Sequence, residues 1–262
     1  MWLPEPAVFG AGLIFSALFV WYTRRRKALS AGGALAAAAV GLWVLWWAGP
    51  RWLLPLFFFF VSGTLLGRRT KGRSSSVDAK HGQPRDAWQV LCNGGIYAAL
   101  STLIPVWPAS DIPEMLMALS LAVSTSDTWS SEIGQFFRQK TVDILRWKPV
   151  PPGLSGGVSG AGTLGGLAGA AAMALLCSFL LYDGSEQIFV LRITIGGFAG
   201  MLSDSLLGAG LQARYQNEPG GAWSDQAGPA SRLYSGLRWM TNDAVNFWSN
   251  ALTTLAGYWF FQ

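Results

Sequence analysis

Long apolar stretches separated by short charged ones run through the whole chain. Most are about 20 residues long, which is the length of an α-helix that crosses a bilayer. The pattern predicts an all-α, polytopic membrane helix bundle, with about eight transmembrane helices in a single domain, residues 1–262. The expected spans are residues 4–23, 28–49, 51–67, 88–107, 112–135, 154–182, 187–212 and 239–261.

Three of these spans contain carboxylates, which are costly in hydrocarbon and are therefore candidates for function. Asp127 and Glu132 lie among several Ser and Thr residues near the end of the fifth span. Asp204 lies in the seventh span, and Asp243 is near the start of the eighth. Three acidic helices in one membrane protein are hard to explain as a structural accident, so we expect these acids to form a site.

The positions of Lys and Arg predict the orientation of the bundle. Of the 19 basic residues, 17 lie in the loops that follow spans one, three, five and seven, and alternate loops share one side. The positive-inside rule makes that side cytoplasmic and places both termini on the non-cytoplasmic side. The main cytoplasmic loops are expected near residues 68–87, 136–153 and 213–238. The acids of spans five, seven and eight then meet at one depth, just beneath these loops.

Amide side chains share helix faces with these acids. Asn242, Asp243 and Asn246 fall within an arc of roughly 100° on the eighth span, at 3.6 residues per turn. The same periodicity aligns two further groups, which are Arg85, Gln89 and Asn93 near the fourth span and Asp204 and Gln212 on the seventh.

Glu132 is the exception among the acids, because it follows Asp127 by five residues. In a regular helix this spacing turns the two side chains about 140° apart. We therefore expect Glu132 to contact another helix rather than to share an ion with Asp127.

A glycine-rich run, residues 153–169, opens the sixth span. Its second half contains overlapping G-x-x-x-G pairs, which predict close helix packing. Its first half follows several prolines and Lys148, at a predicted cytoplasmic helix N-terminus. Free N–H groups there can form a phosphate cradle, and packing is the other reading of the same glycines. The residues of this candidate cradle are Ser155, Gly156, Gly157 and Ser159.

Composition agrees with the membrane class. Hydrophobic residues make up 51% of the chain and charged residues 13%, about half of the charged share of soluble domains. The net charge of +5 follows the topology rather than forming one basic surface, so nucleic acid is not an expected partner. Cys92 and Cys177 each lie in an apolar segment and are expected as core residues. Residues 215–235 are rich in Gly, Pro and Ser, which predicts an exposed loop.

The chemistry of these groups favours magnesium. Carboxylates and amides without a His or Cys partner form a hard-oxygen site that suits Mg²⁺, so Asp127, Asp204 and Asp243 are the predicted metal ligands. Arg85 and Lys148 can hold phosphates beside the metal. Phosphoryl transfer depends mainly on positioning and charge neutralisation. A phosphate monoester acceptor needs no strong base, because its second pKa is about 6.

Two other interpretations compete with phosphoryl transfer. The carboxylates could only hydrogen-bond to neighbouring Asn and Ser, but such bonds average about 0.6 kcal/mol in a bilayer, whereas burying a charge costs several times more. An ion-coupled transporter or flippase of isoprenoid phosphates would also use intramembrane acids. Transporter sites lie near the midplane, whereas these residues gather toward one face, which favours an enzyme.

Five ordered motifs resemble one integral-membrane family, formerly of unknown function. It includes transmembrane protein nineteen and the chloroplast phytyl-phosphate kinase of vitamin E and phylloquinone synthesis. The resemblance extends over about residues 5–260. The motifs are Gln89-Val-Leu-Cys-Asn93-Gly-Gly, Ser126-Asp127-Thr-Trp-Ser-Ser-Glu132-Ile-Gly134, Pro152-Gly-Leu-Ser-Gly156-Gly-Val-Ser159, Asp204-Ser-Leu-Leu-Gly208-Ala-Gly-Leu-Gln212 and Asn242-Asp-Ala-Val-Asn246.

The resemblance implies a kinase that converts a phytyl or polyprenyl monophosphate to the diphosphate, with CTP or another nucleoside triphosphate and Mg²⁺. The implied membrane is the bacterial inner membrane or the thylakoid. Two departures bear on the site. Leu154 and Ser155 stand where the family motif reads Thr-Asn, which leaves the backbone cradle but puts those side chains in doubt. Residues 215–235 contain no cysteine, so no metal knuckle is expected there.

Overall fold

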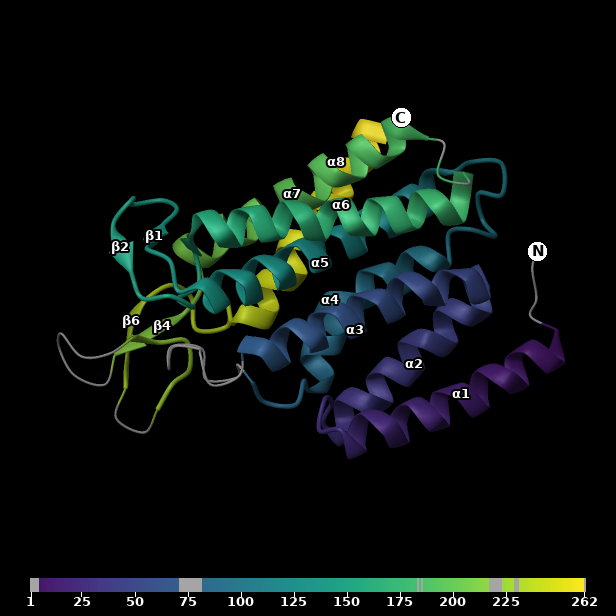
Figure 1. Cartoon of the computed structure of the whole chain (residues 1–262), viewed down its shortest axis with the longest axis horizontal. Coiled ribbons are helices and arrows are strands. Elements are labelled where there is room, and N and C mark those ends of the chain that lie inside the picture. Colours follow the sequence, from purple (N-terminus) through teal and green to yellow (C-terminus); the bar gives the residue numbers. More distant parts are fainter. Residues whose placement is uncertain are drawn as a thin grey trace.

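Eight α-helices and two small sheets make up the described part of the chain (Figure 1). The computed structural model describes residues 5–70, 82–182, 184, 186–216, 223–228 and 231–261. The helices are α1 (Pro6–Arg25), α2 (Ala31–Ala48), α3 (Leu53–Thr70), α4 (Ala87–Ser101), α5 (Ile112–Phe137), α6 (Gly160–Tyr182), α7 (Gln187–Gly210) and α8 (Asn242–Phe261), with a 3₁₀ turn η1 (Pro50–Trp52) before α3. The predicted helix bundle is therefore confirmed.

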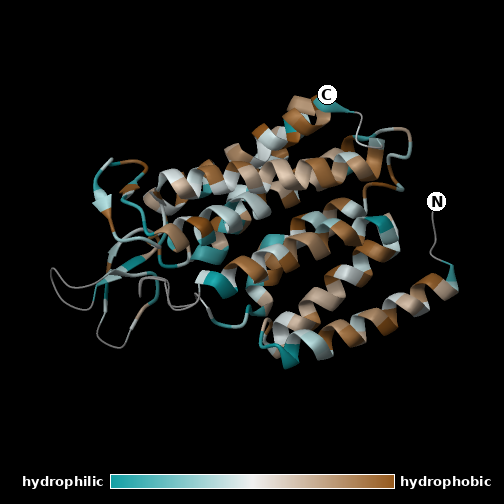
Figure 2. Ribbon diagram, in the orientation of Figure 1, coloured by the Kyte–Doolittle hydropathy of each residue, from teal (hydrophilic) through white to brown (hydrophobic). Residues whose placement is uncertain are grey.

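The outer faces of the helices are apolar, as a lipid environment requires. Figure 2 shows hydrophobic residues along the helices and hydrophilic ones gathered near the strands. Leu18, Leu164 and Trp259 are 60–72% exposed, and an exposed apolar surface of this kind marks a contact with membrane or protein. By length and composition, five helical segments can cross a membrane: α1, α2, η1 with α3, α6 and α7. The other three helices carry most of the predicted polar residues.

The start of α1 and the end of α8 lie at one end of the bundle, and the strands lie at the other (Figure 1). The turn between α1 and α2 and the C-terminal end of α3 are also on the strand side. The C-terminal end of α3 and the described residues of the loops after the first, fifth and seventh helices therefore share one end, as the alternation of Lys and Arg predicts.

Helix α5 is the centre of the bundle and packs against α3, α4, α6, α7 and α8. Its residues from Leu116 to Ser126 are all buried. Glycines let α6 and α7 approach it: a Cβ added at Gly169 would lie 3.0 Å from the Thr125 carbonyl oxygen, and one at Gly197 would lie 2.8 Å from Ala122 Cβ. The close packing predicted for the second half of the glycine run is confirmed.

Two helix boundaries differ from the prediction. α6 begins at Gly160 rather than near residue 154, because Gly153 and Gly156 have φ angles of +85° and +78°, outside the helical region. α4 ends at Ser101 rather than near residue 107. Pro105 explains this end, because a proline ring clashes with the carbonyl four residues earlier in a helix.

Two antiparallel sheets were not predicted. β1 (Thr141–Asp143) pairs with β2 (Pro149–Val150) and β3 (Gly157–Val158), and β4 (Arg214–Gln216) pairs with β5 (Trp223–Ser224) and β6 (Arg232–Ser235). The expectation of an exposed loop over residues 215–235 is therefore wrong about the loop, since β4, β5 and β6 lie there, while none of the described residues of this range is buried. These strands are two to four residues long, too short for a readable alternation, and they are stabilised by pairing. Residues 71–81, including the sole histidine, lie outside the described residues.

We expect Gly197→Ala to destabilise the protein and Gly95→Ala not to. A Cβ at Gly197 meets α5, and such overpacking costs about 1–3 kcal/mol. A Cβ at Gly95, in α4, meets nothing within 4 Å, and alanine there gains up to about 1 kcal/mol of helix propensity. Thermal unfolding of both variants in detergent measures the difference. Equal midpoints would contradict the proposed α5–α7 contact.

Candidate functional site

A cavity of about 530 Å³ opens at the strand end of the bundle and collects the predicted site residues. All of them line it except Lys148. They are Arg85, Gln89, Asn93, Asp127, Glu132, Ser155, Gly156, Gly157, Ser159, Asp204, Gln212, Asn242, Asp243 and Asn246. The volume lies within the usual range for small-molecule sites. The topology argument therefore brought together residues from α4, α5, α7, α8 and the loop before α6.

Asp204 is the most enclosed acid of the cavity, with 7% of its surface exposed. Its Oδ2 accepts a hydrogen bond of 2.9 Å from Ser249 Oγ on α8. With its amide oriented to satisfy its hydrogen bonds, Asn246 Nδ2 donates to the same oxygen at 3.1 Å. The carboxylate of Asp127 is close enough to Asp204 to interact with it electrostatically. The two acids of α5 and α7 thus form a pair.

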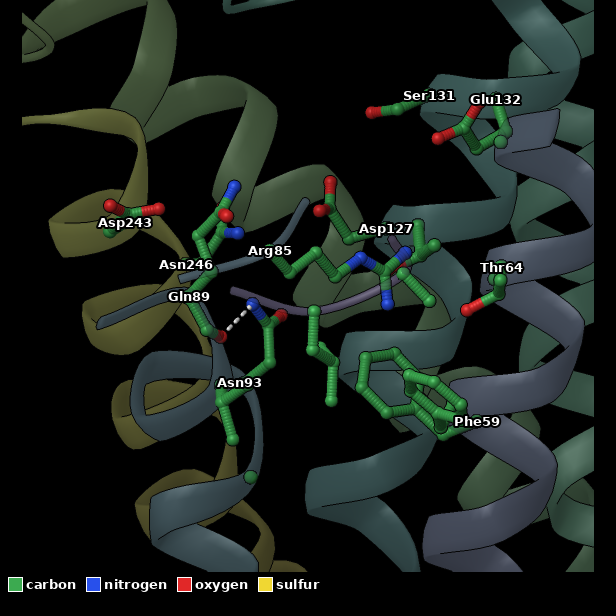
Figure 3. A pocket seen from close by; sticks show the side chains of 18 of the residues that line it. Phe59, Thr64, Arg85, Gln89, Asn93, Asp127, Ser131, Glu132, Asp243 and Asn246 are labelled. Carbon is green, nitrogen blue, oxygen red and sulfur yellow. Dashed lines mark hydrogen bonds between the residues drawn. The ribbon is translucent and has the colours of Figure 1, made fainter. Parts of the chain in front are cut away.

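Arg85 lies at the edge of this pair. Figure 3 shows its side chain between Asp127 and the ring of Phe59. The guanidinium carbon is 5.9 Å from the centre of that ring. The backbone of Arg85 is fixed against the start of α2, because its N–H donates to Ala28 O and its carbonyl accepts from Ser30 N. A cation is therefore held where a phosphate beside the acids would need one.

Glu132 faces a different helix from Asp127, as its spacing predicts. Its Oε2 accepts a hydrogen bond from Thr70 Oγ1, at the end of α3. A Cβ at Gly67 would lie 3.1 Å from Glu132 Oε1, so the carboxylate packs closely against this glycine of α3. Glu132 also lines the cavity, above Arg85 in Figure 3. It therefore joins α5 to α3 at the rim of the site.

The amides of α4 have local roles as well. Gln89 forms a capping box with Asp86, in which Gln89 Oε1 accepts from Asp86 N at 3.0 Å. Asn93 Nδ2 donates to the Gln89 carbonyl at 2.8 Å (Figure 3). Both residues line the cavity. The stripe predicted on this helix is present, and part of its hydrogen-bonding capacity stabilises the start of α4.

Gln212 offers a free acceptor. Its side chain is 2% exposed and lines the cavity, and its Oε1 has no hydrogen-bond partner among the described residues. A buried acceptor left without a donor costs about 1–3 kcal/mol. A ligand that donates a hydrogen bond would remove that cost.

The loop of residues 152–159 is a strand-bound loop and not the N-terminus of α6. At that terminus Ala161 N donates to Gln139 Oε1 at 2.8 Å, and Gly162 N donates to Ser159 Oγ at 3.2 Å. These N–H groups are therefore already bound by the side chains of Gln139 and Ser159, and the phosphate cradle expected at a helix start is not formed there. In the loop itself the Gly157 N–H already donates to the Leu154 carbonyl at 2.9 Å, so any cradle there has to use the backbone at Gly156.

Residues not predicted as functional fix this loop. Arg214, in β4, donates to the Ser155 carbonyl at 2.7 Å and pairs with Asp143 of β1 at 3.4 Å. Burial raises the pKa of the Asp143 carboxyl, but hydrogen bonds from the N–H groups of Arg146 and Leu145 and the charges of Arg214 and Arg146 outweigh it, so the pKa lies below its usual value. Nothing in the sequence pairs two residues 71 positions apart.

Lys148 is separate from the other predicted residues. It is exposed beside the turn between β1 and β2, and it does not line the cavity. Its carbonyl accepts a hydrogen bond from Asp143 N at 2.9 Å. The sequence predicts Lys148 as a phosphate ligand because it lies just before the glycine run. The hairpin of β1 and β2 places it away from that run.

The carboxylates of the cavity suit a hard cation only if two of them, rather than three, bind it. Within the residues that the structure describes, no group of three or more His, Cys, Asp or Glu side chains is placed to hold a metal ion. Mg²⁺ commonly uses one or two carboxylates and completes its shell with water and phosphates. Asp127 and Asp204 therefore fit, and a shared role for Asp243, at the start of α8, stays a prediction.

An apolar exterior around a polar cavity defines the molecule as an integral membrane protein with a site at one end of its bundle. The chain belongs to the family described as integral membrane protein DUF92, whose model matches residues 14–254.

Relatives of this chain come from plants and archaea. It is 31% identical to Protein PGR of Arabidopsis thaliana over 270 residues, 92% of each chain. It is 32% identical to an uncharacterised membrane protein of Methanocaldococcus jannaschii over 191 residues, 71% of this chain and 76% of that one. It is 28% identical to Protein VTE6, chloroplastic, of Arabidopsis thaliana over 227 residues, 83% of this chain and 61% of that one. No solved structure matches.

We expect Asp143→Ala to loosen the loop of residues 152–159. The change leaves Arg214 buried without its carboxylate, and breaking a buried pair costs about 3–5 kcal/mol. Thermal unfolding in detergent and amide exchange of the loop report the loss. Arg146→Gln is the matched control, because the Arg146 side chain is 52% exposed and such pairs contribute at most about 1 kcal/mol. Equal effects of the two changes would contradict this role for Asp143.

Proposed function

We propose that this protein is a membrane-embedded kinase that phosphorylates a phytyl or polyprenyl monophosphate to the diphosphate. The donor is a nucleoside triphosphate, CTP or another. The observation that carries the proposal is the Asp127–Asp204 pair beside Arg85 in one cavity at the strand end. The motif resemblance to the family that contains the chloroplast phytyl-phosphate kinase supports it, as does the similarity to a chloroplast relative, Protein VTE6.

The reaction needs positioning more than proton transfer. An oxygen of the lipid monophosphate forms a bond to the terminal phosphorus of the triphosphate, and the bond from that phosphorus to the nucleoside diphosphate breaks. The acceptor is already ionised near neutral pH, so no general base is required. Arg85 holds the facing phosphates against their mutual repulsion. Asn93 and Asn246 orient the phosphate oxygens, and Asn242 and Gln212 donate to or accept from the nucleotide.

Magnesium fits the same carboxylates. Asp127 and Asp204 would hold the ion, with Asp243 nearby, and when bound the ion would neutralise phosphate charge. The loop backbone at Gly156 and Gly157 also lines the cavity; the Gly157 N–H donates to the Leu154 carbonyl at 2.9 Å, so a phosphate there would be met by the N–H of Gly156. This arrangement admits a lipid from the bilayer and a nucleotide from water.

We expect Asp204→Asn and Asp127→Asn to abolish diphosphate formation while the protein remains folded. The assay uses purified protein in detergent with phytyl or geranylgeranyl monophosphate, Mg²⁺ and each nucleoside triphosphate in turn. Asp111→Asn is the control acid: it is exposed before α5 and does not line the cavity. A fully active Asp204→Asn variant would remove that residue from the mechanism.

The same assay separates the kinase from a transporter. A kinase consumes nucleotide in micelles, where no sealed compartment exists, and a transporter does not. Folded wild-type protein that forms no product with any donor would favour the ion-coupled transporter or flippase, with the acids reassigned to ion coupling.

We further propose that the strand end faces the cytoplasm of a bacterial inner membrane or the equivalent side of a thylakoid. A cysteine at Arg146, in the exposed turn between β1 and β2, should react with an impermeant reagent only in inside-out vesicles. A cysteine at Ser110, before α5, should react only in right-side-out vesicles. The reverse pattern would invert the orientation. Cys92 and Cys177 are buried and should stay unlabelled.

A further inference from the structure

The cavity has a second, apolar arm that the proposed phosphoryl transfer does not use. Beyond Arg85 its lining continues between α1, α2 and α3. Most side chains there are hydrophobic or absent, with Ser16 and Thr64 as hydroxyl exceptions, and they include Phe15, Phe19, Gly41, Leu45, Phe57 and Phe60. An apolar space that opens onto a charged site within one cavity is suited to a molecule with a charged head and a hydrocarbon tail.

The arm exists because α2 and α3 diverge. α2 packs mainly against α1 and α4, and α3 packs mainly against α5, so α2 and α3 make few contacts with each other. Helix α1 closes the space between them through aromatic pairs: the rings of Phe19 and Phe60 are 5.1 Å apart, and those of Phe15 and Phe57 are 6.5 Å apart. Three helices thus surround the arm.

The arm is long enough for a lipid chain. From Gly63, which faces Arg85, its lining on α3 extends back to Leu53, ten residues at 1.5 Å each, or about 15 Å. The hydrocarbon core of a bilayer is about 30 Å thick. A tail in this arm would therefore extend from Arg85 over about half of that thickness.

Arg85 lies where the charged site and the apolar arm of the cavity meet. Figure 3 shows Phe59 on one side of its guanidinium and Asp127 on the other. A Cβ at Gly63, in α3, would lie 2.9 Å from an Arg85 guanidinium nitrogen, so the guanidinium lies directly against this glycine. A phosphate bound here would have its ester-linked chain directed toward the aromatic side chains of α3.

We propose that this arm, between α1, α2 and α3, holds the hydrocarbon tail of a single-chain lipid monophosphate, and that Gly41 determines which tails fit. The phosphorylation of the bound lipid rests on the proposed function, whereas the binding of its tail in the arm does not. One apolar arm leads to one charged end, which fits a lipid with one chain rather than a two-chain phospholipid.

Gly41 is the position that tests the arm. It lies on α2 and lines the cavity, and a Cβ added there meets nothing within 4 Å. A larger side chain would therefore enter the arm without disturbing the helix packing. Gly10, on α1, gives a matched control, because a Cβ there also meets nothing within 4 Å and Gly10 does not line the cavity.

The experiment compares Gly41→Leu with Gly10→Leu for two monophosphates, geranylgeranyl and geranyl. The ratio of kcat/KM for the longer tail to that for the shorter one should fall at least about tenfold in Gly41→Leu, the scale of discrimination that one or two methylenes produce in an apolar pocket. It should stay at the wild-type value in Gly10→Leu. An unchanged ratio in folded Gly41→Leu protein overturns the inference and leaves the kinase standing.

Photo-crosslinking tests the arm without turnover. Geranylgeranyl monophosphate with a diazirine at the tail end should label residues 6–70 in the wild type and in Gly10→Leu, and should label Gly41→Leu several-fold less. Labelling elsewhere overturns the inference, as does equal competition by a two-chain phosphatidic acid. Labelling of this segment by a wild-type protein that transfers no phosphate would support the arm and reject the kinase.

Discussion

A carboxylate inside a membrane helix needs polar partners from neighbouring helices, and the arrangement of this bundle follows from that need at Asp204. Its hydrogen bonds to Ser249 and Asn246 join α7 to α8. One turn beyond Asn246, the amide of Asn250 donates to Ser124 Oγ on α5 at 3.0 Å. The polar face of α8 therefore joins α5 and α7, the two helices that carry Asp127 and Asp204. The distance between these two acids depends on the contacts that α8 makes.

The other wall of the cavity depends on the sheets outside the bundle. Gly156, with its positive φ angle, packs against Ala209 at the end of α7, where a side chain would clash. Arg214 holds the carbonyl of the preceding residue, and Asp143 in turn holds Arg214. The position of the loop is thus set by one strand from each sheet, and it can move only if a buried ion pair opens.

Different parts of the chain build the different parts of the cavity. Helices α5, α7 and α8 supply the acids, the sheets supply a backbone loop, and α1, α2 and α3 supply an apolar space that reaches the same cavity. The proposed phosphoryl transfer to a lipid would need this combination, because one substrate would be dissolved in hydrocarbon and the other in water. Arg85, between Phe59 and Asp127, stands at the boundary of the two environments.

The sequence by itself determined the helices, the end of the bundle at which basic residues gather, and the acids and amides that line the cavity, because a bilayer restricts length, charge and depth in ways that can be read residue by residue. It also predicted that Glu132 would contact another helix rather than share an ion with Asp127. Only the tertiary structure decided that Glu132 contacts α3, that Lys148 lies outside the cavity, and that Asp143 and Arg214 support the loop of residues 152–159. Those outcomes depend on pairing between distant segments, whose local sequence carries no periodic signal, and on side-chain contacts that form only when the helices pack.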